Sequence, residues 1–85
     1  MDLELINWVK DGPCRLKTLK IIEDEYLISS EIADNLDINR ASASRILRDL
    51  KDKGLVSDVS EGSRTKSYVL TKKGKELLSK IKGKN

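Results

Sequence analysis

Two amphipathic helical patterns separated by only three residues constrain this chain of 85 residues more than any other feature. The first pattern covers residues 29–36 and the second covers residues 40–53. Each places its apolar side chains on one face, which predicts two helices packed on a common core. The apolar residues are Ile32, Ala33 and Leu36 in the first helix and Ala43, Ile46, Leu47 and Leu50 in the second. The chain between the helices must therefore turn sharply.

The residues at the helix starts and in the connection suit this arrangement. Ser29 or Ser30 can accept a hydrogen bond from an exposed amide, so we expect one of them to cap the first helix. Asp37 is expected near a left-handed backbone position, which Asp tolerates less easily than Gly but better than most residues. We expect Ile38 to point inward between the helices and Asn39 to cap the second helix.

Further elements are expected on both sides of this pair. Before it, residues 3–10 predict a short helix, residues 13–23 a second helix with Pro13 in its first turn, and residues 26–28 an edge strand. After it, residues 55–60 and 68–71 predict a β-hairpin, and Thr71 can cap a last helix over residues 72–82. The fold class is mainly α with a small β-hairpin, with about five helices and a two- to three-stranded antiparallel sheet.

One domain is expected over residues 1–85, because a chain this short forms a single core. Its parts are the N-terminal helix (1–12), the two helices with their tight turn (29–53), the hairpin (55–71) and the C-terminal helix (72–82).

The charge of the chain is distributed unevenly. The formal net charge is only +3, but residues 1–38 carry four basic and nine acidic side chains, whereas residues 39–85 carry thirteen basic and five acidic ones. Clustered Lys and Arg are what the neutralisation of phosphates requires. The same distribution also fits the solvated surface of a Lys-rich protein, so charge alone leaves both interpretations open.

Several classes of protein find no support in the composition. The single cysteine, Cys14, excludes an intramolecular disulfide, and the absence of His removes most zinc sites and most pairs of nucleophile and base. We therefore expect no metal, no cofactor and no enzymatic activity. The N-terminus has no basic segment followed by an apolar stretch, and no apolar run approaches the length of a membrane span. A cytoplasmic protein without a membrane partner is expected.

The stretch from Ser29 to Thr71 resembles the winged helix-turn-helix of small transcription regulators of the MarR and ArsR type. The segments that carry the resemblance are SSEIADNLDINRASASRILRDLKDKGLV and SYVLTKKGKELL. It covers about half of the chain well and most of the rest loosely, and the run from Ile38 to Val56 is its most specific part. Two departures matter: Asp37 stands where these families often have Gly, and the thiolate cluster of the metal-sensing members is absent. The second departure argues against a metal sensor.

The resemblance implies that the second helix enters the major groove of double-stranded DNA. Arg45 is the first candidate for a bidentate contact with guanine, and Arg40 is expected to share this readout or to hold phosphate. Arg48 and Lys51 are expected on the DNA backbone. The candidate contacts in this helix are Arg40, Ala41, Ser42, Ser44, Arg45, Arg48 and Lys51.

The loop of the hairpin is a second candidate DNA contact. Its candidate residues are Ser63, Arg64, Thr65 and Lys66, with Arg64 reaching an adjacent minor groove or holding phosphate. A homodimer is expected through the N-terminal helix, the C-terminal helix with Leu77, Leu78 and Ile81, or both.

Two alternatives are weighed beside this interpretation. A winged helix can also serve as a protein-interaction module in a larger transcription or nucleic-acid-processing complex, but three arginines on one helix face weigh against that role. Trp8, with Leu3, Ile6 and Val9, is interpreted as a packing stripe rather than a ligand pocket, and no sizeable effector cavity is expected.

Overall fold

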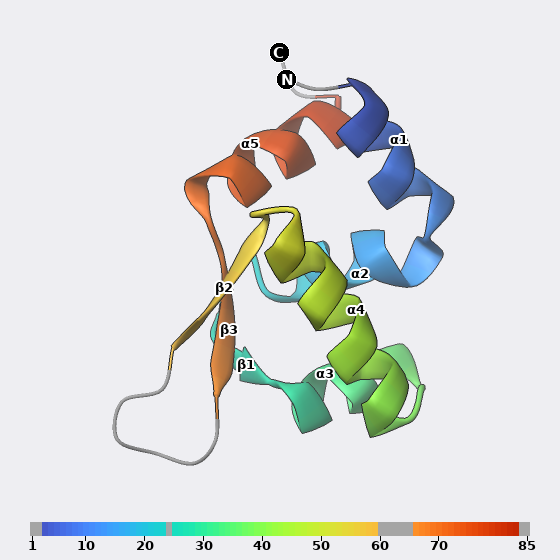
Figure 1. The fold of residues 1–85 in the computed structure, drawn as a ribbon, viewed down its shortest axis with the longest axis vertical. Coiled ribbons are helices and arrows are strands. Elements are labelled where there is room, and N and C mark those ends of the chain that lie inside the picture. The colour runs from blue at the N-terminus through green and yellow to red at the C-terminus, as the bar shows by residue number, and fades with distance from the viewer. Residues whose placement is uncertain (1–2, 24, 60–65, 84–85) are drawn as a thin grey trace.

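The computed structural model describes residues 3–23, 25–59 and 66–83. Within these ranges the chain forms five helices and three strands (Figure 1). They are α1 (Leu3–Asp11), α2 (Pro13–Ile21), β1 (Leu27–Ile28), α3 (Ser29–Leu36), α4 (Arg40–Asp52), β2 (Val56–Val59), β3 (Ser67–Leu70) and α5 (Lys72–Ile81). The predicted fold class, mainly α with a small antiparallel sheet, is confirmed.

The elements divide along the long axis of the molecule. Helices α1 and α5 lie at one end, and strands β2 and β3 run from α5 toward the other end, where α3 and the turn between α3 and α4 lie (Figure 1). The core between them is aliphatic, and its fully buried side chains include Val9, Leu19, Ile22, Ile32, Ala43, Leu47, Leu50, Leu55, Val56, Leu77 and Leu78. Burying one such Leu or Ile side chain contributes about 1.5–3 kcal/mol. In the described residues, no helix is long and apolar enough to cross a membrane.

The connection between α3 and α4 has the predicted backbone. Asp37 adopts the left-handed conformation, with φ 58° and ψ 46°, and the N–H of Ile38 donates to the carbonyl of Ala33 at 3.0 Å. The carboxamide oxygen of Asn39 accepts from the N–H of Ser42 at 2.7 Å, so Asn39 caps α4 as predicted. Ile38, which was expected to point inward, is only half-buried.

The prediction that Ser29 or Ser30 caps α3 is wrong. Both serines lie inside the helix, and Ile28 occupies the capping position in an extended conformation without a side-chain cap. The reason is that Ile28 also pairs with Ser67 in the sheet, so the strand passes into the helix with no residue between them. The Glu31 carboxylate accepts from the Ile28 N–H at 3.0 Å in place of a serine cap.

The sheet has the order β1-β3-β2, and both pairings are antiparallel. Strand β2 begins at Val56 rather than Leu55, because the backbone of Leu55 bonds to the end of α4 and to Thr71 instead. Its N–H donates to the carbonyl of Leu50 at 3.0 Å, and its carbonyl accepts from the N–H of Thr71 at 3.0 Å. Gly54, with φ 77°, supplies the left-handed residue that ends α4.

Helix α5 is joined to the end of α4 by Thr71 and Gly74. The Thr71 hydroxyl donates to the carbonyl of Gly54 at 2.7 Å and accepts from the N–H of Gly74 at 3.0 Å, so Thr71 caps α5 as predicted. Gly74 is buried, and a Cβ atom there would collide with the carbonyl oxygen of Leu55. The hairpin, α4 and α5 therefore meet at one tightly packed corner.

Candidate nucleic-acid interface

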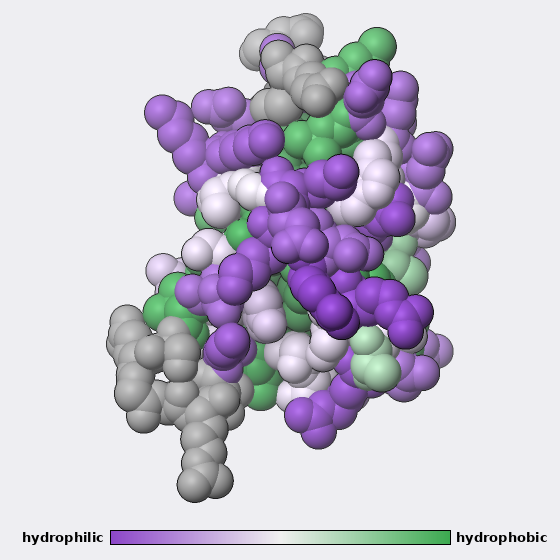
Figure 2. Space-filling view, viewed as in Figure 1, coloured by the Kyte–Doolittle hydropathy of each residue, from purple (hydrophilic) through white to green (hydrophobic). Residues whose placement is uncertain are grey.

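Helix α4 has two faces of opposite character. Ala43, Leu47 and Leu50 are completely buried, and Ile46 packs half-buried against the core. The opposite face exposes Arg40, Ala41, Ser44, Arg45 and Arg48. A band of hydrophilic side chains crosses the centre of the molecule over this helix (Figure 2). The division predicted from the apolar spacing is therefore found in the structure.

The three arginines of this face are not engaged within the described part of the chain. Neither hydrogen bonds nor ion pairs connect the side chains of Arg40, Arg45 and Arg48 to other described residues. A guanidinium without an intramolecular partner keeps its five donors for a ligand. Ser42 is half-buried and contributes its N–H to the cap of the helix, so only its hydroxyl is left for another contact.

Two lysines predicted to hold phosphate share one carboxylate that the sequence analysis missed. Lys51 Nζ lies 3.1 Å from Asp58 Oδ1, and Lys66 Nζ lies 3.4 Å from Asp58 Oδ2. Lys51 belongs to α4, Asp58 to β2, and Lys66 immediately precedes β3, so this cluster ties the hairpin to the helix. The ion pair with Lys51, reinforced by Lys66, lowers the pKa of Asp58 below its ordinary value of 3.8.

The remaining candidate residues of the hairpin loop, Ser63, Arg64 and Thr65, lie outside the described residues. Lys66 is exposed and immediately precedes β3, at the end of the hairpin where the loop joins the strands. An acidic residue in a strand of a basic hairpin was the only signal for Asp58, because Lys51 reaches it only when β2 folds back beside α4 and Lys66 only when β3 pairs with β2.

The Trp8 side chain packs half-buried against the core, as expected, and its ring also faces a cation at the C-terminal end of α4. The guanidinium of Arg15 is 4.1 Å from the centre of the indole ring and Lys53 Nζ is 5.3 Å from it, which are cation–π distances. Arg15 also donates to the Trp8 carbonyl at 2.6 Å. Val9 is buried as expected, but Leu3 is 69% exposed.

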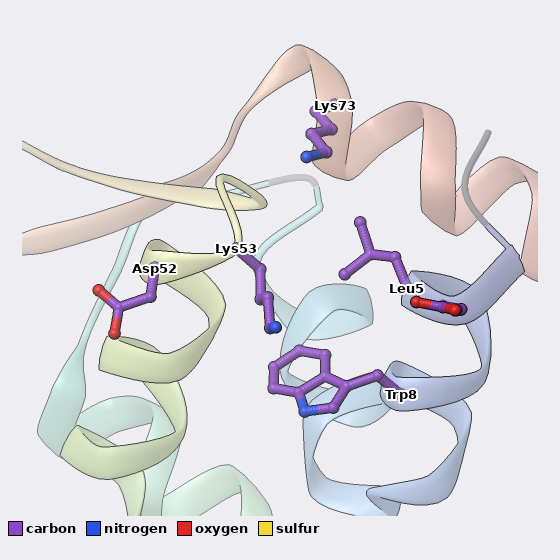
Figure 3. Close-up of a pocket in the computed structure, with 6 residues that line it drawn as sticks. Leu5, Trp8, Asp52, Lys53 and Lys73 are labelled. Atoms are coloured by element: carbon purple, nitrogen blue, oxygen red, sulfur yellow. The ribbon is translucent and has the colours of Figure 1, made fainter.

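A hollow of about 420 Å³ opens beside Trp8 (Figure 3). The residues that line it come from α1, from the end of α4 and from α5, and they are Glu4, Leu5, Trp8, Asp52, Lys53 and Lys73. A hollow of this volume was not expected from the sequence, but four of its six lining residues are charged, unlike the mainly apolar lining of small-molecule pockets. Lys53 extends from the end of α4 toward the Trp8 ring, and Lys73 points from α5 into the same space (Figure 3).

The sequence matches the winged helix-turn-helix family over residues 15–84, and the chain belongs to that family. One relative is the xylose repressor of Staphylococcus xylosus, which is 42% identical over 48 residues. This match covers 56% of the present chain but only 12% of the repressor. The present chain therefore corresponds to a small part of that protein.

Solved structures share the fold over nearly the whole chain. The S. aureus MepR–DNA complex superposes with a TM-score of 0.82 at 22% identity, covering 92% of this chain and 67% of MepR. YusO from Bacillus subtilis gives a TM-score of 0.83 at 20% identity, covering 95% of this chain and 60% of YusO. At these identities the likeness shows the fold, which agrees with the MarR-type resemblance of the sequence.

Proposed function

We propose that this protein binds double-stranded DNA sequence-specifically and regulates transcription. The observation that carries the proposal is the exposed face of α4, where Arg40, Arg45 and Arg48 have no partner among the described residues. The buried face of the same helix is fixed to the core, so the arginines are presented on a rigid element. The relative named as a repressor and the structural neighbour solved with DNA support this class of function.

In the proposed complex, the first turn and a half of α4 lies in the major groove. Arg45 pairs with the two acceptors of a guanine, and Arg40 shares the readout or holds a phosphate. Ala41, Ser42 and Ser44 border the base edges without strong discrimination. The left-handed Asp37 and the Asn39 cap fix the angle at which α4 leaves α3, and therefore the direction in which this face points.

The backbone of the DNA is held by residues beyond this turn and by the hairpin. Arg48, Lys51 and Lys66 contact phosphates, which fixes register without conveying sequence. Ser63, Arg64 and Thr65 extend this contact, with Arg64 entering the minor groove or holding phosphate. The protein acts in the cytoplasm without enzymatic activity, cofactor or metal.

We also propose a homodimer formed by α1 and α5. Leu77 and Leu78, which were expected at this interface, are instead buried in the core of the chain, because α5 packs them inward. The apolar side chains left for a partner at this end are the strongly exposed Leu3 and the half-buried Ile81. A two-fold pair would double the contacts that one small module makes with DNA. Sedimentation equilibrium should show a dimer at micromolar concentration, and a monomer at high micromolar concentration would contradict this part of the proposal.

The test of sequence readout compares two duplexes. One is selected by the wild-type protein from a random pool and the other is unrelated. Arg45→Ala should weaken binding to the selected duplex by about 1–3 kcal/mol and leave binding to the unrelated duplex nearly unchanged. Lys20→Ala, which removes an exposed cation from α2, is the control and should alter neither. Equal losses on both duplexes would show that Arg45 holds only phosphate.

A further inference from the structure

Asp58 lies between α4 and the hairpin, where it forms ion pairs with Lys51 and Lys66. Neither core packing nor the proposed base reading requires an acidic residue at this position. Its carboxylate is the only acidic group, among the described residues, in an ion pair with the proposed DNA-contacting side chains of α4 and the hairpin. The Asp58 side chain is 19% exposed, whereas those of Lys51 and Lys66 are 50% and 57% exposed. The carboxylate is thus the shielded member of the cluster, and both ammonium groups reach solvent.

The attraction of a polyanion to this cluster depends on the net charge of Lys51, Lys66 and Asp58. Two lysines alone would present two positive charges, but the ionised carboxylate reduces the sum to one. Ammonium groups at 3.1 and 3.4 Å from the carboxylate oxygens already donate to an anion. A DNA phosphate that approaches Lys51 or Lys66 must therefore compete with Asp58 for the same donors.

We propose that Asp58 is an intramolecular competitor of DNA phosphate, which weakens the sequence-independent part of binding by engaging Lys51 and Lys66. The inference rests on the proposed DNA-binding function and adds to it a residue that limits affinity. Because both lysines contact the backbone only, Asp58 acts on every sequence alike. Base reading by Arg40 and Arg45 is left untouched, since those residues lie on the first turn and a half of α4.

The variant Asp58→Asn tests the proposal, because it removes the charge and keeps the size of the side chain. One additional effective cation should steepen the slope of log Kobs against log salt by about 0.9. The variant should therefore gain about eightfold in affinity over wild type for each tenfold dilution of the salt. The gain should be equal on the selected and the unrelated duplex.

The matched control is Glu76→Gln, which changes the net charge by the same amount on an exposed position of α5. It should change the slope by much less, because no proposed phosphate contact lies on that helix. Circular dichroism of all three proteins checks that the fold is retained. If Asp58→Asn gains no more than Glu76→Gln, or binds more weakly than wild type, the competition is refuted and Asp58 instead positions the lysines.

Elution from a heparin column separates this proposal from the proposed function. Asp58→Asn should elute at higher salt than both wild type and Glu76→Gln, since heparin is a polyanion that needs no sequence readout. If neither wild type nor variant binds duplex DNA but the later elution persists, DNA binding fails and competition for the two lysines stands. If both proteins bind DNA and elute together from heparin, the competition fails and DNA binding stands.

Discussion

At the scale of single residues, a few polar side chains set the geometry of the proposed interface. Asn39 fixes the start of α4, Asp37 supplies the left-handed turn before it, and Asp58 links the helix to the hairpin through two lysines. None of the three belongs to the apolar core. Each acts by satisfying backbone groups or by arranging charge, so each can be tested without removing core packing.

The ionisation of Asp58 should make part of the stability depend on pH. Its pKa is lowered in the folded state, so the ionised carboxylate favours folding above the unfolded value of 3.8, and this contribution is lost as the pH falls through the lower folded value. Asp58→Asn should therefore be slightly less stable than wild type at neutral pH, and the difference should vanish at strongly acidic pH. Urea unfolding of both proteins at both pH values measures this stability difference. A difference that grows on acidification would contradict the expected direction of the pH dependence.

The cap of α4 predicts a second effect. Asn39→Ala leaves the N–H of Ser42 without its acceptor and should cost about 1 kcal/mol of unfolding free energy. Asn39→Ser, which restores a capping oxygen, should recover most of the loss. Chemical denaturation of the three proteins checks this, and equal stability of the Ala and Ser variants would show that the bond at 2.7 Å contributes nothing.

At the scale of elements, the corner between α4, the hairpin and α5 fixes the hairpin in place. Gly74→Ala places a methyl group against the carbonyl oxygen of Leu55, and overpacking of this kind should cost about 1–3 kcal/mol. Ser79→Ala, at an exposed position of the same helix, should change stability by much less. Thermal unfolding compares the two, and an unchanged midpoint for Gly74→Ala would contradict the close approach.

Local patterns predicted the helix pair well because capping and apolar spacing are encoded within a few residues. The two faces of α4, the Asn39 and Thr71 caps and the left-handed Asp37 are all of this kind. Contacts that depend on how the strands pair and how they pack beside α4 were missed. Ile28 displaced the predicted serine cap because it pairs with Ser67, and Asp58 meets Lys51 only after the hairpin has packed beside α4.

At the scale of the whole molecule, the two ends have different proposed tasks. The hairpin end carries the exposed face of α4 and the Asp58 cluster, and the opposite end carries α1, α5 and the hollow beside Trp8 (Figures 1 and 3). The hollow could not be predicted from apolar spacing, because its lining comes from three helices far apart in sequence, α1, α4 and α5, which only the tertiary fold brings together. Of the two cations at Trp8, Lys53 connects α1 to the end of α4, and Arg15 connects it to α2.

The central claim is that the protein binds DNA through this basic face. Fluorescence anisotropy of a labelled duplex, titrated with the wild-type protein over a range of salt concentrations, tests it most directly. Arg48, Lys51 and Lys66 are the proposed phosphate contacts, and the charge of Asp58 offsets one of them. The two remaining effective contacts predict a slope of log Kobs against log salt of about −2 per chain or steeper. Absence of binding at low salt, or binding that salt does not weaken, would contradict the claim and favour a protein-interaction module.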